Sequence, residues 1–226
     1  MAITEEIRAW VKNFPDIKTD RVLARPLQAS DDQILYQAMQ NPRVNKWVGG
    51  FQQPFDLAAA RRWLSKRLDV MDSGEGLYLA AFYNGVQELM GFMYIRFWEH
   101  DDVEVAGALN ELYWGKGFAE EVAIPLIDKM FNKFGFNRVW ASTALENRSS
   151  IRLLTALGFT YEGQKMIPTP DGSGRVSNIF GVTREGWANR PLQRFEDDPD
   201  PAEIAARRRA LIKACQEARS RAGEHG

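Results

Sequence analysis

A glycine-containing turn at residues 113–119, with the sequence Tyr-Trp-Gly-Lys-Gly-Phe-Ala, narrows the possible folds more than any other segment of the chain. It follows a predicted strand and opens a predicted helix. Gly115 and Gly117 let the backbone turn sharply and approach a ligand without a Cβ in the way. The first N–H groups of the helix have no internal partner and lie at the positive end of its dipole. Such a unit is suited to binding phosphate, although the same pattern also makes a plain tight connection.

Two well-known nucleotide-binding loops fail to match this turn. A Walker loop requires Gly, four residues and then Gly-Lys-Ser/Thr, whereas Lys116 is followed by another glycine and an aromatic residue. A dinucleotide fingerprint requires a third glycine three residues after the second, and that position is Glu120. The turn is therefore unlike both of these loop classes.

Around the turn, hydrophobic periodicity and turn residues predict an α/β domain with a mixed sheet. Strands are expected at residues 21–27, 77–83, 89–97, 103–109, 138–143, 160–167 and 176–182. Helices are expected within 1–20 up to Pro15, and at about 30–40, 54–71, 117–134, 148–157 and 200–221. Asn84-Gly85 is a strong hairpin signal, and residues 30–33 (Ser-Asp-Asp-Gln) match a capping box.

The length of 226 residues exceeds one typical domain of roughly 100–150 residues, which predicts one compact domain with appendages. Composition changes after Trp187, where a polar, proline-containing stretch begins. We therefore expect an N-terminal helical extension at 1–20, the domain itself at 21–187, and a linker with a C-terminal helix at 188–226.

Charge and cysteine content limit the partners and the compartment. A formal net charge of −1 argues against a protein that coats nucleic acid or an anionic membrane. Cys215 is the single cysteine, so an internal disulfide is impossible and a reducing compartment is expected. The first residues are acidic where a secretory signal is basic. The longest apolar run, Leu77–Tyr83, is seven residues, against roughly 20 for a membrane span. A cytoplasmic location is expected.

Further motifs occur in a fixed order along the chain. They are Arg25-Pro26-Leu27, Asn41-Pro42-x-Val44, the turn itself, Glu146-Asn147-x-x-Ser150 before Leu157-Gly158-Phe159, and a closing segment from Phe180 to Trp187. Together they resemble the GNAT N-acetyltransferase superfamily, and within it the RimJ- and RimL-like branch, over roughly residues 19–187. The resemblance implies a GNAT acyltransferase fold, with a central, mostly antiparallel sheet of about seven strands flanked by helices. It also implies an N-acetyltransferase that moves an acetyl group from acetyl-CoA to a primary amine by direct attack in a ternary complex.

By the same resemblance, the cosubstrate acetyl-CoA is bound along the turn and the strand before it. Its diphosphate would be held mostly by backbone N–H groups of Trp114, Gly115, Lys116, Gly117, Phe118 and Ala119. The strand 103–109, ending in Leu109, would separate from its neighbour and leave backbone groups for the pantetheine arm. Asn147 would contact that arm or cap its helix, and Arg148 and Arg152 would reach the 3′-phosphate or remain ordinary surface arginines. The resemblance implies no metal.

The reaction requires a neutral amine. A lysine amine with a pKa of ~10.4 is almost wholly protonated at pH 7, whereas an α-amino group at ~7.7–8.0 needs much less help from a base. Glu104 stands at the start of the central strand, where many members of the resembled family carry a glutamate, so the resemblance makes it the preferred general base, directly or through water, with a surface carboxylate as the alternative. His100 is less favoured because it lies in a polar loop. Leu154 occupies the position of a proton-donating tyrosine of many relatives. Ser150 is therefore the candidate near the leaving sulfur, unless its hydroxyl only bonds backbone at the helix start.

The acceptor is expected to be a small-molecule or peptide amine, and residues 47–51 lie where this fold lines the acceptor side. Neither nucleic acid nor a membrane is expected as a partner, and a homodimer is left open. A rival function is a non-catalytic acyl-CoA-binding regulatory module, which would keep the turn but dispense with the base. Another is a nucleic-acid-binding protein that uses residues 207–209 and Lys213. Glu203 and Glu217 share that predicted helix, which favours a solvated face instead.

Overall fold

An eight-stranded sheet forms the centre of the structure, a computed structural model that describes residues 3–48, 55–84, 89–98, 102–168 and 174–190. The strands are β1 (Ile17–Lys18), β2 (Val22–Pro26), β3 (Gly76–Tyr83), β4 (Leu89–Phe97), β5 (Asp102–Leu109), β6 (Arg138–Ala144), β7 (Thr160–Ile167) and β8 (Arg175–Thr183). Their order across the sheet is β1-β2-β3-β4-β5-β6-β8-β7. Neighbouring strands are antiparallel, except that β5 and β6 run parallel. The expected mixed, mostly antiparallel sheet is confirmed, with the short β1 added at one edge.

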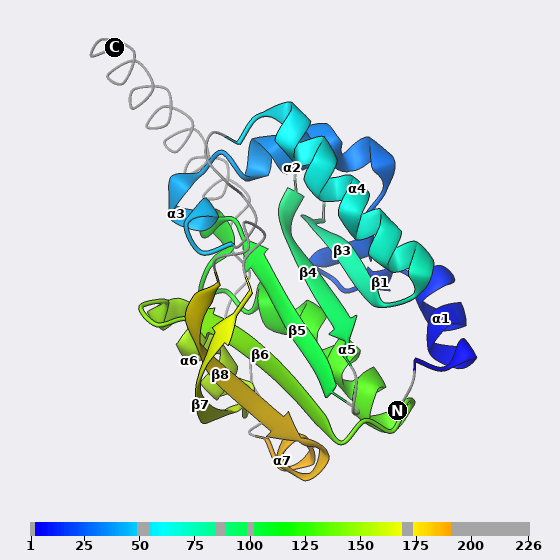
Figure 1. Cartoon of the computed structure of the whole chain (residues 1–226), viewed down its shortest axis with the longest axis vertical. Coiled ribbons are helices and arrows are strands. Elements are labelled where there is room, and N and C mark those ends of the chain that lie inside the picture. The colour runs from blue at the N-terminus through cyan, green and yellow to red at the C-terminus, as the bar shows by residue number, and fades with distance from the viewer. Residues whose placement is uncertain (1–2, 49–54, 85–88, 99–101, 169–173, 191–226) are drawn as a thin grey trace.

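Helices cover both faces of this sheet (Figure 1). They are α1 (Glu5–Lys12), η1 (Ala29–Asp31), α2 (Asp32–Ala38), α3 (Pro42–Asn45), α4 (Leu57–Ser73), η2 (Glu111–Tyr113), α5 (Phe118–Asn132), α6 (Arg148–Ala156) and α7 (Arg184–Ala188). Along β3, Tyr78 and Ala80 pack in one hydrophobic cluster with α2 and α4. Leu77 and Leu79 pack in a second cluster with α1 and α5. Because successive strand side chains point to opposite faces, α4 and α5 lie on opposite sides of the sheet.

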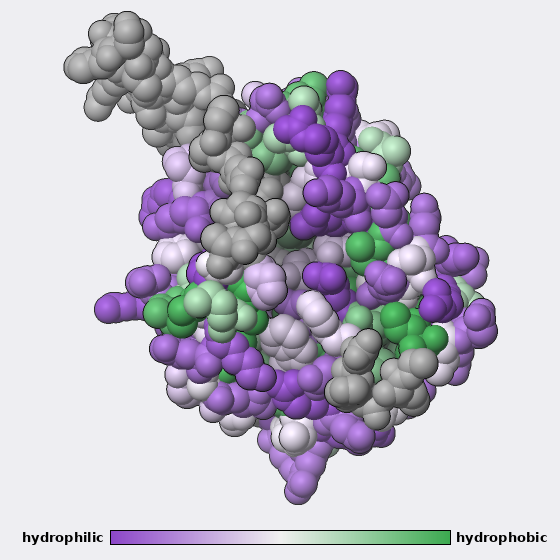
Figure 2. All heavy atoms as spheres, in the orientation of Figure 1, coloured by the Kyte–Doolittle hydropathy of each residue, from purple (hydrophilic) through white to green (hydrophobic). Residues whose placement is uncertain are grey.

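Helix α4 illustrates how the sequence pattern positions these layers. The Asp56 carboxylate accepts the Ala59 N–H at 2.6 Å, which starts the helix, and Gly74 ends it in the left-handed conformation at φ 73°. Trp63 and Leu64 on the inner side are buried. The outer side is polar, and polar side chains over this helix are purple in Figure 2.

The N-terminal helix packs onto the same core as the sheet. Thr4 Oγ1 accepts the Ile7 N–H at 3.2 Å, and acidic residues occupy the first turn of α1. Ile7, Trp10 and Val11 are buried in the cluster that also contains α5. The segment expected as an extension therefore contributes apolar surface to the core of the domain beside it.

The capping box expected at residues 30–33 is wrong. The buried Asp31 carboxylate instead accepts the Gln28 N–H at 2.8 Å and two guanidinium hydrogen bonds from Arg25 at 2.8 and 2.7 Å. Charge-assisted hydrogen bonds of this kind are stronger than a bond to a neutral hydroxyl. Asp31, rather than the serine before it, therefore fixes the turn that leads into α2.

Two short helices, α3 and α7, were not expected from the sequence. Helix α2 stops at Ala38, and Asn41 starts the separate short helix α3, with its Oδ1 accepting the Arg43 N–H at 3.0 Å. Helix α7 begins at Arg184, after the capping residue Thr183, whose hydroxyl accepts the Gly186 N–H at 3.1 Å. Both differences arise because a single capping side chain is enough to start a turn of helix too short to show a periodic pattern.

Several expected features fall on residues that the structure does not describe. They are Gly85 of the hairpin turn, His100, residues 49–51 of the acceptor segment, and the C-terminal helix at 200–221. The strands on both sides of the hairpin turn are as expected. Within the described ranges, no helix has the length and apolar character needed to cross a lipid bilayer.

Candidate active site

The sheet opens between its two parallel strands. Among the described residues, β5 pairs with β6 only over Asp102–Glu104 and Arg138–Trp140. In contrast, β5 pairs with β4 along its length, from Val103 to Leu109. Residues 105–109 of β5 therefore keep one edge of their backbone free of β6. Buried backbone N–H and C=O groups need partners, so this edge is suited to hydrogen bonding with a ligand.

A cavity of about 920 Å³ occupies this opening. Strands β4, β5 and β6, the turn at 113–119 and helices α4, α5 and α6 form its wall. The expected site residues that line it are Glu104, Leu109, Trp114, Gly115, Gly117, Phe118, Ala119, Asn147, Ser150 and Arg152. Lys116 and Arg148 are described residues that were expected at the site but are not among the residues lining this cavity. Three separate segments of the chain thus meet at one cavity.

The glycine turn has the backbone geometry that its sequence predicts. Gly115 has φ 73° and Gly117 has φ 80°, both in the left-handed region that side-chain-bearing residues avoid. Gly117 is also the residue that precedes α5, so it leaves the first N–H groups of that helix without a capping side chain. The indole Nε1 of Trp114 donates to the Leu109 carbonyl oxygen at 2.8 Å and ties the turn to the end of β5.

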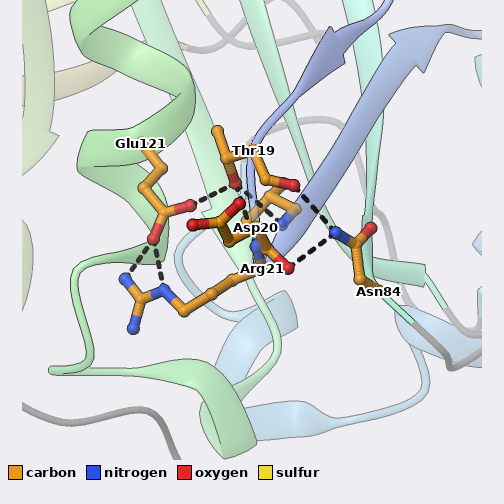
Figure 3. Close-up of polar contacts among 6 residues, drawn as sticks. Thr19, Asp20, Arg21, Asn84 and Glu121 are labelled. Carbon is orange, nitrogen blue, oxygen red and sulfur yellow. Dashed lines mark hydrogen bonds and ion pairs between the residues drawn. The ribbon is translucent and has the colours of Figure 1, made fainter.

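A polar network braces the start of α5 from the side of the first strands (Figure 3). The Glu121 carboxylate accepts the Thr19 hydroxyl hydrogen bond at 2.5 Å and forms an ion pair with Arg21. The Asn84 side-chain nitrogen donates to the carbonyl oxygens of Thr19 and Asp20, both at 2.9 Å. The network links the β1–β2 connection, the end of β3 and the first turn of α5, and so positions the glycine turn.

Helix α6 brings two further expected residues to the cavity. Asn147 caps this helix, because its Oδ1 accepts the Ser150 N–H at 3.2 Å. Both residues also line the cavity, so the capping role of Asn147 is compatible with a contact to a ligand. Arg152 is exposed at the cavity edge, and Arg148 is exposed beside a smaller pocket of about 190 Å³.

Glu104 is a buried carboxyl group rather than the surface carboxylate considered as its alternative. It is 5% exposed and lines the cavity from β5. Its oxygens accept hydrogen bonds from Trp98 Nε1 at 3.1 Å and from Tyr94 Oη at 3.4 Å. Burial raises the pKa of Glu104, while the bond from Trp98, the charge of Arg96 and the bond from Tyr94 act in the opposite direction.

Sequence reasoning missed the side chains that surround Glu104. Arg96 lies directly opposite Glu104 across the β4–β5 ladder, and Tyr94 lies opposite Tyr78 across the β3–β4 ladder. Burial raises the pKa of Tyr94, so its hydroxyl remains a donor at neutral pH. The spacing of Tyr94 and Arg96 by two in a predicted strand was the available signal, because it places both on one face. Arg67 of α4 completes this part of the wall.

Across the opening, β6 contributes one more polar group. The Thr143 hydroxyl is buried and has no hydrogen-bond partner among the described residues. It lies in the part of β6 beyond the last pair with β5, and it lines the cavity. A buried hydroxyl of this kind is available to a ligand between the strands. The described ranges contain no group of three or more His, Cys, Asp or Glu side chains that could hold a metal ion.

Known proteins share this sequence pattern and this architecture. The family model described as acetyltransferase (GNAT) domain matches residues 21–160. The curated protein "Uncharacterized N-acetyltransferase p20" of Bacillus licheniformis is 30% identical over 148 residues, which cover 64% of this chain and 82% of that protein. Among solved structures, the ribosomal-protein-S5-alanine acetyltransferase of Vibrio fischeri aligns at 18% identity with a TM-score of 0.63, covering 76% of this chain and 98% of that one. RimL, a ribosomal L7/L12 alpha-N-protein acetyltransferase in complex with coenzyme A, aligns at 15% identity with a TM-score of 0.64, covering 75% of this chain and 98% of that one.

The two structural neighbours share the fold, and they agree with the resemblance to the RimJ- and RimL-like branch. The matched residues 21–160 run from the start of β2 to the start of β7, and they contain the opening between β5 and β6, the glycine turn and the start of α6. The chain therefore belongs to the GNAT acetyltransferase family and is an acyltransferase enzyme.

Proposed function

We propose that the enzyme transfers an acetyl group from acetyl-CoA to a primary amine, by direct attack in a ternary complex. The observation that carries this proposal is the junction of three features at one cavity: the free edge of β5, the glycine turn before α5, and the buried carboxyl group of Glu104. A long, polar cosubstrate and a separate amine both need a place in such a site. The cavity of about 920 Å³ is large enough to receive them side by side.

The residues present fit acetyl-CoA. Backbone N–H groups at the end of the glycine turn and in the first turn of α5 would hold its diphosphate, because the first N–H groups of a helix have no partner within it and lie at the positive end of this helix of 15 residues. The N–H groups of Tyr113 and Trp114 donate instead to the carbonyl oxygens of Asn110 and Glu111. The free edge of β5 at residues 105–109 would hydrogen-bond the pantetheine arm, next to Asn147. Arg152 at the cavity edge is suited to the 3′-phosphate. When bound, acetyl-CoA supplies a thioester carbonyl that an amine can attack.

Glu104 is the group we assign to take the proton of the acceptor amine, directly or through a water molecule. A carboxyl group with a raised pKa is a better proton acceptor near neutral pH than an ordinary surface carboxylate. Tyr94 and Trp98 hold the carboxylate in place through their hydrogen bonds. An α-amino group, with a pKa of ~7.7–8.0, demands less of this base than a lysine side chain with a pKa of ~10.4.

Two other groups complete the proposed chemistry. A backbone N–H of β5 beyond Glu104 would stabilise the negative charge that develops on the carbonyl oxygen. Ser150 lines the same cavity from the first turn of α6, and its hydroxyl is the group we assign to donate a hydrogen bond to the leaving sulfur, which departs as a thiolate and takes up a proton from water. The acceptor in this proposal is a peptide N-terminus or a small-molecule amine, in line with the ribosomal-protein acetyltransferases that share the fold.

Titration calorimetry with acetyl-CoA tests the binding part of the proposal. Gly115→Phe should abolish binding, because a side chain there would project where the diphosphate is expected. Gly135→Phe is the matched control: Gly135 has φ 75°, close to the 73° of Gly115, and lies outside the cavity lining. Both changes should destabilise the fold similarly, by about 1–2 kcal/mol for a left-handed side-chain-bearing residue. Equal binding of acetyl-CoA by the two variants would count against the assigned turn.

The transfer itself is tested by free-thiol release from acetyl-CoA in the presence of a panel of amines that includes N-terminal peptides. We expect release that depends on the amine and a product that carries an acetylated nitrogen by mass spectrometry. Tight binding of acetyl-CoA without amine-dependent release for any member of the panel would refute the transfer to amines.

A further inference from the structure

Among the described residues, a guanidinium group without a carboxylate partner lines the cavity beside Tyr78. Arg67 extends from the inner side of α4, four residues after the buried Trp63, with its guanidinium carbon 4.3 Å from that ring and 6.0 Å from the Tyr78 ring. Its Nε is buried and has no hydrogen-bond partner within the described ranges, and no ion pair to Arg67 is formed there. Aromatic rings stabilise a cation over their faces but leave its N–H groups unsatisfied.

A second guanidinium group lies nearby. Arg96 also lines the cavity, with its guanidinium carbon 4.8 Å from the Trp98 ring, and it faces Glu104 across the β4–β5 ladder. The charged side chains placed beside Tyr78, Tyr94 and Trp98 are therefore these two guanidinium groups and the carboxyl group of Glu104. Glu120, the other acidic residue of the described lining, lies in the first turn of α5 at the end of the glycine turn.

Keeping two cations in one partly buried site is unfavourable. Burial lowers the pKa of Arg67; Tyr78 and Tyr94 act against this shift, and the like charge of Arg96 adds to it. Removing a cation from water without an anion to bind it is costly. An anionic ligand would compensate both effects, because a carboxylate matches the fork of an arginine and accepts two parallel hydrogen bonds.

We propose that the acceptor amine carries a carboxylate group, which Arg67 binds while Glu104 faces the amine. The proposal rests on the proposed function and adds the class of acceptor. Acetyl-CoA is an unsuitable source of the anion, because its diphosphate is assigned to the turn before α5. The Arg67 side chain lies elsewhere, on the inner side of α4 beside Tyr78. The carboxylate belongs either to a free amino acid or to an acidic side chain near the N-terminus of a peptide.

Matched pairs of acceptors test this proposal. One pair is an amino acid and its carboxamide, with kcat/KM expressed per neutral amine at each pH because the two amines differ in pKa. The other pair is a C-terminally amidated peptide with glutamate at its second position and the same peptide with glutamine. In one of the pairs the anionic member should be preferred roughly 10- to 100-fold in kcat/KM, the range expected for a hydrogen-bonded ion pair. The pair that shows the preference identifies the source.

Variants connect the preference to the residue. Arg67→Gln should bring the two members of the preferred pair close to parity by lowering kcat/KM for the anionic member alone, and Arg67→Lys should retain part of the preference. Arg62→Gln is the control, because Arg62 is an exposed arginine of the same helix outside the cavity lining. It should keep the preference of the wild type.

The outcomes separate this proposal from the one on which it rests. Equal kcat/KM for both members of both pairs in the wild-type enzyme overturns the carboxylate proposal and leaves amine acetylation standing. Full preference in Arg67→Gln also overturns it, since the anion is then bound elsewhere. The absence of transfer to every amine, despite bound acetyl-CoA, refutes the proposed function and this inference together. If the Arg67 variants fail to fold, the wild-type comparison still decides whether the preferred acceptor carries a carboxylate.

Discussion

Replacing Glu104 by glutamine tests the proposed base with little disturbance of the site. The carboxyl group is 5% exposed and accepts hydrogen bonds from Trp98 at 3.1 Å and from Tyr94 at 3.4 Å. A glutamine has nearly the same size; its carbonyl oxygen can accept from Trp98 Nε1 and its amide nitrogen can donate to the Tyr94 hydroxyl oxygen, but the amide cannot take up a proton at ordinary pH. The variant therefore removes the base and keeps the shape of the cavity.

The expected loss of rate in Glu104→Gln follows from the proposed role of Glu104 as general base. A positioned general base typically contributes about 10²–10⁴-fold in rate, which corresponds to ~2.7–5.4 kcal/mol of activation free energy at 1.36 kcal/mol for each factor of ten. We expect kcat of Glu104→Gln to fall within this range. The KM for acetyl-CoA should stay close to that of the wild type, because the turn at 113–119 lies on another part of the cavity wall.

The pH dependence gives the sharper test. Burial raises the pKa of Glu104, so the wild-type rate should rise as the pH passes through this raised pKa and the carboxyl group loses its proton. The glutamine variant should lack this rise. Its rate should follow only the titration of the acceptor amine, at about 7.7–8.0 for an α-amino group, and should therefore recover toward high pH.

Steady-state thiol release from acetyl-CoA, measured across the acid and neutral range with one peptide acceptor, is the suitable assay. Glu185→Gln is the control: Glu185 is exposed on α7, outside the cavity lining, and its loss should leave both kcat and the pH profile unchanged. A profile for Glu104→Gln that keeps the wild-type acidic limb would refute the assignment of Glu104 as the base.

Three further predictions concern electrostatics and stability. The raised folded-state pKa of Glu104 means that its contribution to stability is fully present below the unfolded pKa and is lost as pH rises through the folded pKa. In urea unfolding, Glu104→Gln should therefore be more stable than the wild type at neutral pH, with a difference that vanishes toward acid pH; a constant difference contradicts this. Trp98→Phe removes the hydrogen bond that most lowers the Glu104 pKa, so the acidic limb of the rate profile should move to higher pH rather than lower. Asp31→Asn removes the charged partner of Arg25 and should lower the free energy of unfolding by about 2–3 kcal/mol in urea, whereas no measurable loss would contradict the importance of this pair.

Local signals explain which parts of the fold the sequence predicts. Apolar runs and the Asn84-Gly85 pair predict β3 and β4 almost to the residue, because a hairpin is a short-range structure. Strand β1 was missed, since two residues contain no period that a sequence can show. The capping box failed because the partner of Asp31 is Arg25, on a strand before the turn. Such a pairing depends on tertiary structure rather than on the spacing of the motif.

The same distinction applies to the candidate site. The glycine turn is a contiguous motif, and its positive φ angles follow from its two glycines. The surroundings of Glu104 come from β3, β4 and α4, so they depend on strand register and on the rotation of the helix about its axis. Arg67 lies on a helix with several exposed basic residues, and sequence reasoning did not distinguish it from them. Its position four residues after the apolar Trp63 was the signal that places it on the inner side.

The topology of the sheet determines where the glycine turn and Glu104 lie relative to each other. Strands β5 and β6 are parallel and are joined by α5, so the start of α5 must lie near the carboxyl end of β5, which is where the glycine turn stands. Because β5 remains in register with β4 up to Leu109, its separation from β6 leaves a wedge that widens toward that turn. Glu104, paired with Trp140, is the last described β5 residue before the strands part. A cosubstrate held at the wide end with its arm along β5 would therefore point its reactive end toward the narrow end, where the proposed base lies.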